Sequence, residues 1–219
     1  MKLPTFKNKE LFELAFTHRS YLNESKDKTE SNERLEFLGD SILSYIMSNY
    51  LFKTYPAYKE GLLTNLRSLL VNTRSLASVA RELHLGEHLL LSRGEEESKG
   101  RENETLLANC FESFIGALYL DQGIEAVEEF LQKTLIPKVE YYVSQKSFKD
   151  PKSMLQEYVQ AQKQHSPIYK VTQEEGPPHA KIFTVGVYVD GELLADGTGT
   201  SKQKAEEYAA KNALEKLEK

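Results

Sequence analysis

The sequence predicts an all-α domain followed by a small α+β domain with the element order α-β-β-β-α along the chain. Three observations support this fold class. In the first part of the chain apolar residues recur at helical spacing, and no strand-like segment precedes residue 165. Residues 181–189 then alternate apolar and polar side chains and are followed by a turn signal. Residues 144–149 are polar and aperiodic, so they form a linker. The domains are predicted at 1–146 and 150–219.

The composition is that of a globular protein: 40% of the 219 residues are hydrophobic. The single cysteine, Cys110, excludes an intrachain disulfide and thiolate metal clusters. No apolar run reaches the roughly 18 residues of a membrane span, and residues 1–6 lack the apolar core of a signal peptide. Together these features predict a cytoplasmic protein with no membrane contact, and we expect no organic cofactor.

The net charge of −5 argues weakly against a nucleic-acid partner, because nucleic-acid-binding domains are often basic. Neither domain has an excess of basic residues. Any contact with nucleic acid must therefore come from small local clusters of lysine and polar side chains.

Helical periodicity accounts for most of the first domain. The predicted helices cover residues 8–23, 32–55, 62–83, 106–120 and 124–142. Ser31 or Asn32 is expected to cap the second helix, Asn72 marks a break in the third, and Pro137 interrupts the fifth. The charged segments 24–31 and 89–101 are predicted to be loops. His18, near the end of the first helix, is either a hydrogen-bonded structural residue, which we favour, or an RNA contact.

The second helix carries an acidic stripe. Glu33, Glu36 and Asp40 are spaced to share one side of the helix, while leucines occupy another. A solvated face is the simplest interpretation of such a stripe. Two residues argue against it: Phe37 lies on the acidic side, where a partner surface would have to cover it, and Gly39 costs about 1 kcal/mol relative to Ala in a helix. Glycine there suits the close approach of another backbone.

The fourth helix presents a second candidate surface. Its apolar side chains are expected to face the core, and Asn109, Glu112, Ser113 and Gly116 lie on its other side. Small residues beside a carboxylate leave room for a facing helix, a metal ion or a substrate. Gly123 suits the turn at the C-terminal end of this helix.

The second domain is predicted from a change of pattern. Residues 151–164 are helical, residues 168–172, 181–189 and 193–199 are strands, and residues 202–217 form an Ala-rich helix. Asp190-Gly191 is a hairpin turn signal between the last two strands.

Three runs carry a resemblance to a known family: residues 33–41, the Thr17-His18-Arg19-Ser20-Tyr21 run, and residues 197–206. The first run resembles the signature of the ribonuclease III family, and the α-β-β-β-α order ending in the third run resembles the double-stranded-RNA-binding domain. The resemblance covers almost the whole chain. It implies a homodimeric, Mg²⁺-dependent endoribonuclease that cuts double-stranded RNA, including rRNA precursors. The products would carry 5′-phosphates, 3′-hydroxyls and short 3′ overhangs.

The resemblance also implies the site residues. Glu36, Asp40, Asn109 and Glu112 would be metal ligands, with Asp40 and Glu112 catalytic. Oxygen-only ligands suit Mg²⁺, with Mn²⁺ as a substitute. A bound ion would polarise the phosphoryl oxygen and activate water, and a second would stabilise the leaving oxygen. Glu33 and Glu60 would be further acids of the active-site valley. Phe37 would insert into a pocket of the other subunit.

Asn109 departs from the family pattern, which has aspartate at this position. An amide oxygen still ligates Mg²⁺ but brings no charge. Three interpretations remain open: an accepted variant with weaker metal binding, which we favour, a need for more Mg²⁺ or for Mn²⁺, or RNA binding without cleavage.

The second domain supplies the expected RNA contacts. Amide and hydroxyl side chains on one stripe of its first helix suit the RNA minor groove, and the lysines at the start of its last helix suit a phosphate. The predicted contact residues are Ser153, Gln156, Gln160, His179, Ser201, Lys202 and Lys204, with Gln164 on the same stripe and Thr200 as another candidate cap. A non-cleaving RNA-binding or ribosome-associated relative is the main alternative function. A hydrolase of small phosphates would leave the second domain unexplained.

Overall fold

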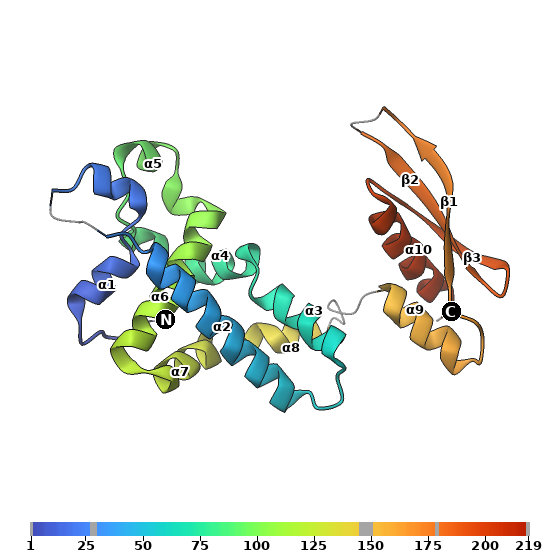
Figure 1. The fold of residues 1–219 in the computed structure, drawn as a ribbon, viewed down its shortest axis with the longest axis horizontal. Helices are drawn as coiled ribbons and strands as arrows, with labels where there is room; N and C mark the ends of the chain where they lie inside the picture. The colour runs from blue at the N-terminus through green and yellow to red at the C-terminus, as the bar shows by residue number, and fades with distance from the viewer. Residues whose placement is uncertain (1, 27–29, 145–150, 178–179, 218–219) are drawn as a thin grey trace. The chain divides into compact units, whose positions relative to one another are not determined.

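The computed structural model describes residues 2–26, 30–144, 151–177 and 180–217 (Figure 1). The chain divides into two compact units, residues 1–148 and 149–219. Each unit has its own hydrophobic core, as the predicted fold class requires. Among the described residues, no helix is both long enough and apolar enough to cross a membrane.

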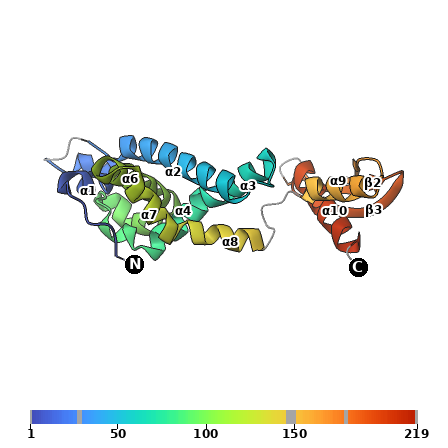
Figure 2. The ribbon, with the colours of Figure 1, turned by 90° about the horizontal axis from the view of Figure 1, so that it is seen from below.

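The first unit is all-α, as predicted. Its α-helices are α1 (Lys9–Ala15), α2 (Glu33–Thr54), α3 (Glu60–Leu70), α4 (Thr73–Glu82), α5 (Arg93–Glu97), α6 (Glu104–Gln122), α7 (Ile124–Thr134) and α8 (Ile136–Ser144). Short 3₁₀ helices are η1 (Arg19–Asn23), η2 (Leu85–His88) and η3 (Gly100–Glu102). Helix α6 is central, since it packs against α1, α2, α4 and α7 (Figures 1 and 2).

Two glycines allow α2 and α6 to touch through their backbones. A Cβ atom on Gly39 would lie 1.8 Å from the carbonyl oxygen of Glu112, and one on Gly116 would lie 2.3 Å from the carbonyl oxygen of Leu35. No side chain fits at either position. The prediction that Gly39 admits another backbone is therefore confirmed, and it explains why a poor helix former lies within this helix.

The first predicted helix is shorter than expected. It ends at Ala15, and Thr17 forms a bridge with Leu90. The backbone N–H of His18 donates to Leu90 (3.1 Å), and that of Leu90 donates to Phe16 (2.9 Å). Residues 19–23 continue as the 3₁₀ helix η1. Pairing with a segment about seventy residues away, which has no local sequence signal, overrides the helical pattern.

Other boundaries follow the prediction in part. The break at Asn72 is confirmed, because its side chain accepts from the N–H of Ser75 and caps α4. The predicted loop 89–101 is wrong in part, since it contains α5, capped by Ser92, and the start of η3. The fifth helix is divided at Leu135 into α7 and α8, next to Pro137. Gly123, with φ of 86°, ends α6 as expected.

The second unit is a three-stranded antiparallel sheet with two helices packed on it (Figures 1 and 2). Its elements are α9 (Pro151–Ala161), β1 (Ile168–Glu175), β2 (Ile182–Val189), β3 (Glu192–Gly199) and α10 (Lys202–Leu217), with strand order β1-β2-β3. The core joins Leu155 and Val159 of α9 to Val187 of β2 and to alanines of α10. Alanine permits α10 to lie close to the sheet.

Two boundaries in the second unit differ from the prediction. Helix α9 ends at Ala161, not at residue 164, because Lys163 is left-handed (φ 60°) and Gln164 donates its N–H to Val159 (3.0 Å). Strand β1 is longer than expected and reaches Glu175. The Asp190-Gly191 turn is confirmed, with φ of 52° and 88° at the two residues, the signs that a type I′ hairpin needs.

Candidate functional site

Three carboxyl groups lie together where α2 crosses α6. Glu36 and Asp40 are one turn apart on α2, and Glu112 lies on α6 at the crossing, where its backbone meets Gly39. Asp40 is exposed, whereas Glu36 and Glu112 are half-buried. The close backbone contact therefore brings the acids of two distant segments to one place.

Burial and like charges act on these carboxyl groups. Burial raises the pKa of Glu112 to about 7, and the charges of Asp40 and Glu36 add to this effect. The pKa of Glu36 is also raised, first by burial and then by Glu33, with a further contribution from Asp40. A hydrogen bond from the Asn109 amide opposes that shift. Such a cluster favours a bound cation, which would relieve the repulsion.

The cluster is not a preformed metal cage. Among the described residues, no three His, Cys, Asp or Glu side chains converge closely enough to hold an ion. The donors are nevertheless all oxygens, and they repel one another, which fits a hard divalent cation such as Mg²⁺. Glu36 and Glu112 would have to turn toward a shared ion, and the long Glu side chain permits this.

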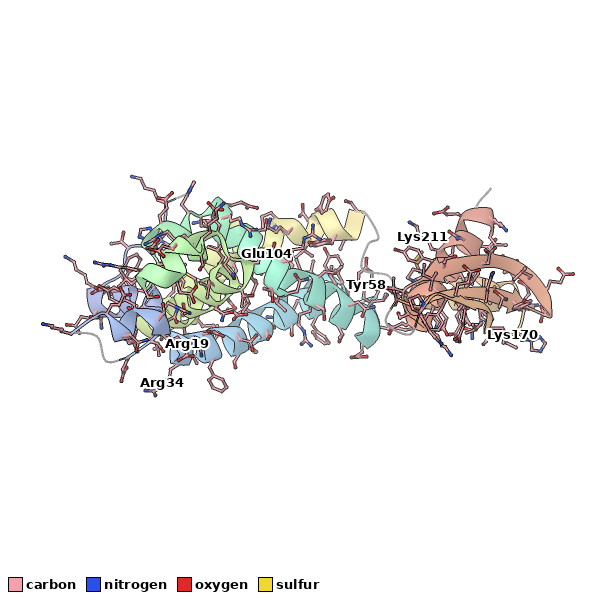
Figure 3. The ribbon with its side chains drawn as sticks, turned by 90° about the horizontal axis from the view of Figure 1, so that it is seen from above. Arg19, Arg34, Tyr58, Glu104, Lys170 and Lys211 are labelled. Atoms are coloured by element: carbon pink, nitrogen blue, oxygen red, sulfur yellow. The ribbon has the colours of Figure 1, made fainter. Side chains whose placement is uncertain are left out.

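Of the two further predicted acids, Glu33 lies next to the cluster, where its charge raises the pKa of Glu36, and Glu60 lies apart from it. Glu33 is exposed, and its carboxylate lies 3.6 Å from Arg19, which is labelled in Figure 3. It also accepts a hydrogen bond from the Ser31 hydroxyl (2.8 Å). Glu60 begins α3, accepts a hydrogen bond from Thr64 (3.0 Å), and lines a hollow beside the C-terminal half of α2. No contact among the described residues joins Glu60 to the cluster.

Asn32 has a role that the sequence did not reveal. It occupies the N-cap position of α2, but its side chain makes no capping hydrogen bond, which corrects the prediction. Its buried amide instead donates to the carbonyl of Ala15 (3.2 Å) and to the hydroxyl of Ser113 (3.3 Å). Ser113 also donates to Ala15 (2.6 Å). This network fixes the start of α2 against α6, directly beside the acid cluster.

His18 is hydrogen-bonded, as the favoured interpretation predicted. Its Nδ1 accepts from the backbone N–H of Ser20 (3.3 Å) and lies 2.8 Å from the Ser20 hydroxyl. The pKa of His18 is lowered from its ordinary value, and burial of the ring is the largest cause. The charge of Glu95 raises this pKa, that of Arg19 lowers it and that of Glu33 raises it, in decreasing order of effect. The imidazole lines a hollow that it shares with Glu36 and Asn109.

Large apolar side chains of α2 point into solvent. Phe37 is 78% exposed, Tyr45 61% and Phe52 71%. Their spacing of eight and seven residues places them on one stripe of the helix. Next to the end of that stripe, α2 and α3 enclose a hollow of about 570 Å³, lined by Tyr45, Leu51, Phe52, Tyr58 and Leu63 among others. Single exposed apolar residues are ordinary, but a stripe of aromatic side chains is a candidate interaction surface.

Family models match both units. A ribonuclease-III-like model matches residues 8–139, and a double-stranded RNA binding motif matches residues 151–217. The chain belongs to the ribonuclease III family. It is 48% identical to Ribonuclease 3 of Streptococcus mutans and 49% identical to that of Bacillus licheniformis, covering 98% of this chain in both cases and 93% and 86% of the relatives. It is an endoribonuclease by that membership.

Solved structures of the ribonuclease III family are similar. The nuclease domain of the Campylobacter jejuni enzyme, described with a region involved in dimer formation, is 40% identical. It matches with a TM-score of 0.56 over 61% of this chain and 90% of its own. Dicer from Pichia stipitis is 28% identical, with a TM-score of 0.52 over 98% of this chain and 97% of its own.

The double-stranded-RNA-binding unit of this ribonuclease III family member exposes most of the predicted contact residues. Ser153, Gln156 and Gln160 are exposed on α9, opposite the buried Leu155 and Val159. Gln164 lies past the end of that helix. His179 lies outside the described residues.

The start of α10 has a specific local structure. Ser201, not Thr200, is the cap, because its hydroxyl accepts from the N–H of Lys204 (3.2 Å). Lys202 lies 3.4 Å from Glu174 on β1 and 5.6 Å from the centre of the Phe183 ring. Lys204 is exposed. The sequence did not indicate the pairing of Lys202 with Glu174, since β1 and α10 are far apart in the chain.

Proposed function

We propose that this protein hydrolyses phosphodiester bonds in both strands of double-stranded RNA with a divalent cation. The observation that supports this most is the meeting of Glu36, Asp40 and Glu112 where the backbones of α2 and α6 touch at Gly39, so that like charges contribute to the raised pKa of Glu36 and Glu112. Residues 1–146 would form the catalytic and dimerisation domain, and residues 150–219 the RNA-binding domain.

Glu36, Asp40, Asn109 and Glu112 are the proposed ligands, and Mg²⁺ is the proposed ion, with Mn²⁺ as a substitute. A cation held there would polarise the scissile phosphoryl group and make water a better nucleophile. Asp40 and Glu112 are the proposed catalytic residues. Glu112, with a pKa of about 7, holds a proton part of the time at neutral pH and would release it when a cation binds. The amide of Asn109 holds Glu36 by a hydrogen bond.

The proposed active form is a homodimer. The aromatic stripe of α2 supports this, because an antiparallel pair of α2 helices related by a two-fold axis near Tyr45 would bring Phe37 of one copy to Phe52 of the other. The α2–α3 hollow at that end of the stripe suits the Phe37 ring. Glu60 lines the same hollow. In such a dimer, Glu60 of one copy would therefore lie near Phe37 of the other copy, at the end of α2 where the acid cluster begins.

The second unit is the proposed RNA-binding unit. Ser153, Gln156 and Gln160 would contact the minor groove, His179 a second groove, and Ser201, Lys202 and Lys204 a phosphate. Exposure of the α9 stripe and of Lys204 supports this assignment. Two active sites in one dimer, each cutting one strand, would leave 5′-phosphates, 3′-hydroxyls and short 3′ overhangs. Precursors of rRNA and other structured RNA in the cytoplasm are the proposed substrates.

The deciding experiment is incubation of long double-stranded RNA with the purified protein in Mg²⁺, beside Glu112→Gln. Short duplexes with 5′-phosphates, absent with the variant, are expected. Binding without cutting, even in Mn²⁺, would favour the alternative of a non-cleaving RNA-binding relative. The presence of Asn109 favours that alternative, because the ligand set then has one negative charge fewer than with the aspartate of the family pattern.

A further inference from the structure

A hollow beside the acid cluster contains a hydrogen-bond donor that the proposed mechanism does not use. This hollow, here called the His18 hollow, has a volume of about 330 Å³. The residues of its lining used here are His18, Arg19, Glu33, Glu36 and Asn109. It opens next to Glu36 and Asn109, so whatever occupies it would lie beside the scissile phosphate.

A chain of hydrogen bonds fixes the tautomer of His18. The backbone N–H of Ser92 donates to the Ser20 hydroxyl oxygen (3.0 Å), which leaves the hydroxyl hydrogen for His18 Nδ1, 2.8 Å away. The backbone N–H of Ser20 also donates to Nδ1 (3.3 Å). A backbone N–H is only a donor, so Nδ1 is an acceptor and carries no hydrogen. The neutral ring therefore carries its hydrogen on Nε2.

This Nε2–H has no hydrogen-bond partner within the part of the chain that the structure describes. The ring cannot simply turn to find one, because two hydrogen bonds hold Nδ1. The segment that carries the ring is also fixed, since the backbone of His18 is bonded to Leu90. The result is a preorganised donor on a residue that lines the His18 hollow.

The charges of the hollow favour a neutral ligand group over an anion. Glu33 and Glu36 both line it, and Arg19, the cation in its lining, is already paired with Glu33 at 3.6 Å. A phosphate placed there would meet these carboxylates. A hydroxyl group would instead accept from Nε2–H and donate to the Glu33 carboxylate, whose oxygens retain free lone pairs. In RNA the group with this chemistry is the ribose 2′-hydroxyl.

We propose that the His18 hollow reads the 2′-hydroxyl of a nucleotide next to the scissile phosphate, with His18 Nε2–H as donor and Glu33 as acceptor. The inference rests on the proposed RNA cleavage at the acid cluster and adds a residue pair that distinguishes RNA from DNA at that point. His18 is thus both structural, through Nδ1, and a specificity-determining residue, through Nε2.

The test couples a change in the protein to a change in the RNA. His18→Asn keeps an acceptor for the Ser20 N–H, because Asn is a good N-cap residue, but it has no group at the place of Nε2. His18→Gln carries an amide N–H that reaches that place. The substrates are one RNA duplex with a defined cut site and a set of duplexes with a single 2′-deoxy nucleotide at each position around the cut. Cleavage is measured under single-turnover conditions.

We expect one position at which 2′-deoxy substitution slows the wild-type protein about fivefold to tenfold, the effect of losing one hydrogen bond. His18→Asn should slow cleavage of all-ribose RNA by a similar factor and show no further loss at that position. His18→Gln should recover part of the discrimination. A purely structural role would slow His18→Asn equally on every substrate and leave the 2′-deoxy penalty intact, and that result would overturn the proposal.

Equal wild-type rates on all the singly substituted duplexes would also overturn it. If the wild-type protein cuts no duplex, the proposed function fails instead. The same comparison is then made by equilibrium binding in the Glu112→Gln background, where loss of the 2′-deoxy penalty in Glu112→Gln/His18→Asn supports the His18 contact. Additive losses in that binding assay would rule it out.

Discussion

The carboxyl group of Glu112 should make the stability of the metal-free protein depend on pH. Its pKa is raised from 4.5 to about 7, so the folded protein prefers the protonated form. That preference stabilises the fold fully below pH 4.5 and is lost as the pH rises through about 7. Glu112→Gln lacks this titration. In EDTA, the variant should therefore melt at a higher temperature than the wild type above pH 7, and the difference should shrink toward pH 4.5.

Thermal unfolding followed by circular dichroism at several pH values makes this comparison. Glu60→Gln is a suitable control, because Glu60 is exposed and stands apart from the acid cluster. A melting-temperature difference for Glu112→Gln that stays constant with pH would contradict the raised pKa. A variant that is more stable but inactive would show that the site is held at a cost in stability.

Asn109 lacks the negative charge of the aspartate in the family pattern, but its amide donates a hydrogen bond to Glu36. Asn109→Asp removes that donor and adds a carboxylate, so it should weaken the metal-free fold and strengthen the binding of Mg²⁺. We expect half-maximal cleavage at a several-fold lower Mg²⁺ concentration and a larger rise of the melting temperature on adding Mg²⁺. Identical Mg²⁺ curves for the two proteins would remove any role for the missing charge.

At the scale of elements, the contact between α2 and α6 is the feature most sensitive to a single added atom. A Cβ at Gly39 would meet the Glu112 backbone at 1.8 Å, so Gly39→Ala must separate the helices. Overpacking of this kind costs about 1–3 kcal/mol. Gly61→Ala is the matched control, since it also lies in a helix, and a Cβ there meets nothing within 4 Å. It should stabilise the protein by up to about 1 kcal/mol.

Denaturant unfolding of both variants measures these opposite effects. Gly39→Ala should also lose activity beyond its loss of stability, because separating the helices moves Glu112 away from Asp40. An unchanged unfolding midpoint for Gly39→Ala would show that the backbones can part freely. Destabilisation by Gly61→Ala would remove the basis for the comparison.

The lysines at the start of α10 give the second prediction for an element. Cations at a helix N-terminus oppose the helix dipole, so these lysines suit a phosphate ligand. Lys202→Gln/Lys204→Gln should weaken binding of double-stranded RNA about tenfold or more and lower the salt dependence by about one unit per lost phosphate contact. Lys211, labelled in Figure 3, lies further along α10 and makes Lys211→Gln the control. Binding is measured by titration at several salt concentrations.

An unchanged salt dependence in the double variant would place the phosphate contacts elsewhere. Lys202 is partly neutralised by Glu174, so the loss from Lys204→Gln alone should exceed that from Lys202→Gln alone. This order follows from the structure, because the two lysines look equivalent in the sequence.

The sequence predicted the features that depend on neighbouring residues in the chain better than those that depend on distant ones. Local periodicity and turn chemistry predicted α2, α6, α10 and the Asp190-Gly191 hairpin, and the glycine within α2 predicted a close neighbour. Features that depend on distant partners were missed. The bridge of Thr17 to Leu90 ends α1 early, and the buried contact of Asn32 with Ser113 replaces a helix cap. Neither pair is joined by a pattern in the chain.

The same limit applies to the candidate site. The spacing of Glu33, Glu36 and Asp40 was visible in one helix, whereas the meeting of Glu36 with Asn109 and Glu112 was expected only from the family resemblance and follows from no spacing in the chain. The tautomer of His18 depends on Ser92, which lies seventy-two residues from Ser20. A histidine in a sequence carries no sign of which ring nitrogen is occupied.

At the scale of the whole molecule, the proposed dimer depends on Phe37. This side chain is 78% exposed in the single chain, and burying an aromatic ring in a partner's hollow supplies much of the binding energy of an interface. Phe37→Ala should therefore raise the dimer dissociation constant by at least tenfold, a loss of 1.4 kcal/mol or more. Sedimentation velocity over a range of concentrations measures it.

If the Phe37 ring of one copy enters the α2–α3 hollow of the other, the effects of changing the ring and of changing the hollow should not add. Leu63→Trp, which fills the α2–α3 hollow, should weaken the dimer as Phe37→Ala does, and the two changes together should weaken it little further, because each removes the same contact. Tyr141→Ala is the control, since Tyr141 is 63% exposed on α8 and lies outside the stripe. An unchanged dimer in Phe37→Ala at low concentration would refute the contact, whereas additive losses in the double variant would assign Phe37 to a different surface of the partner.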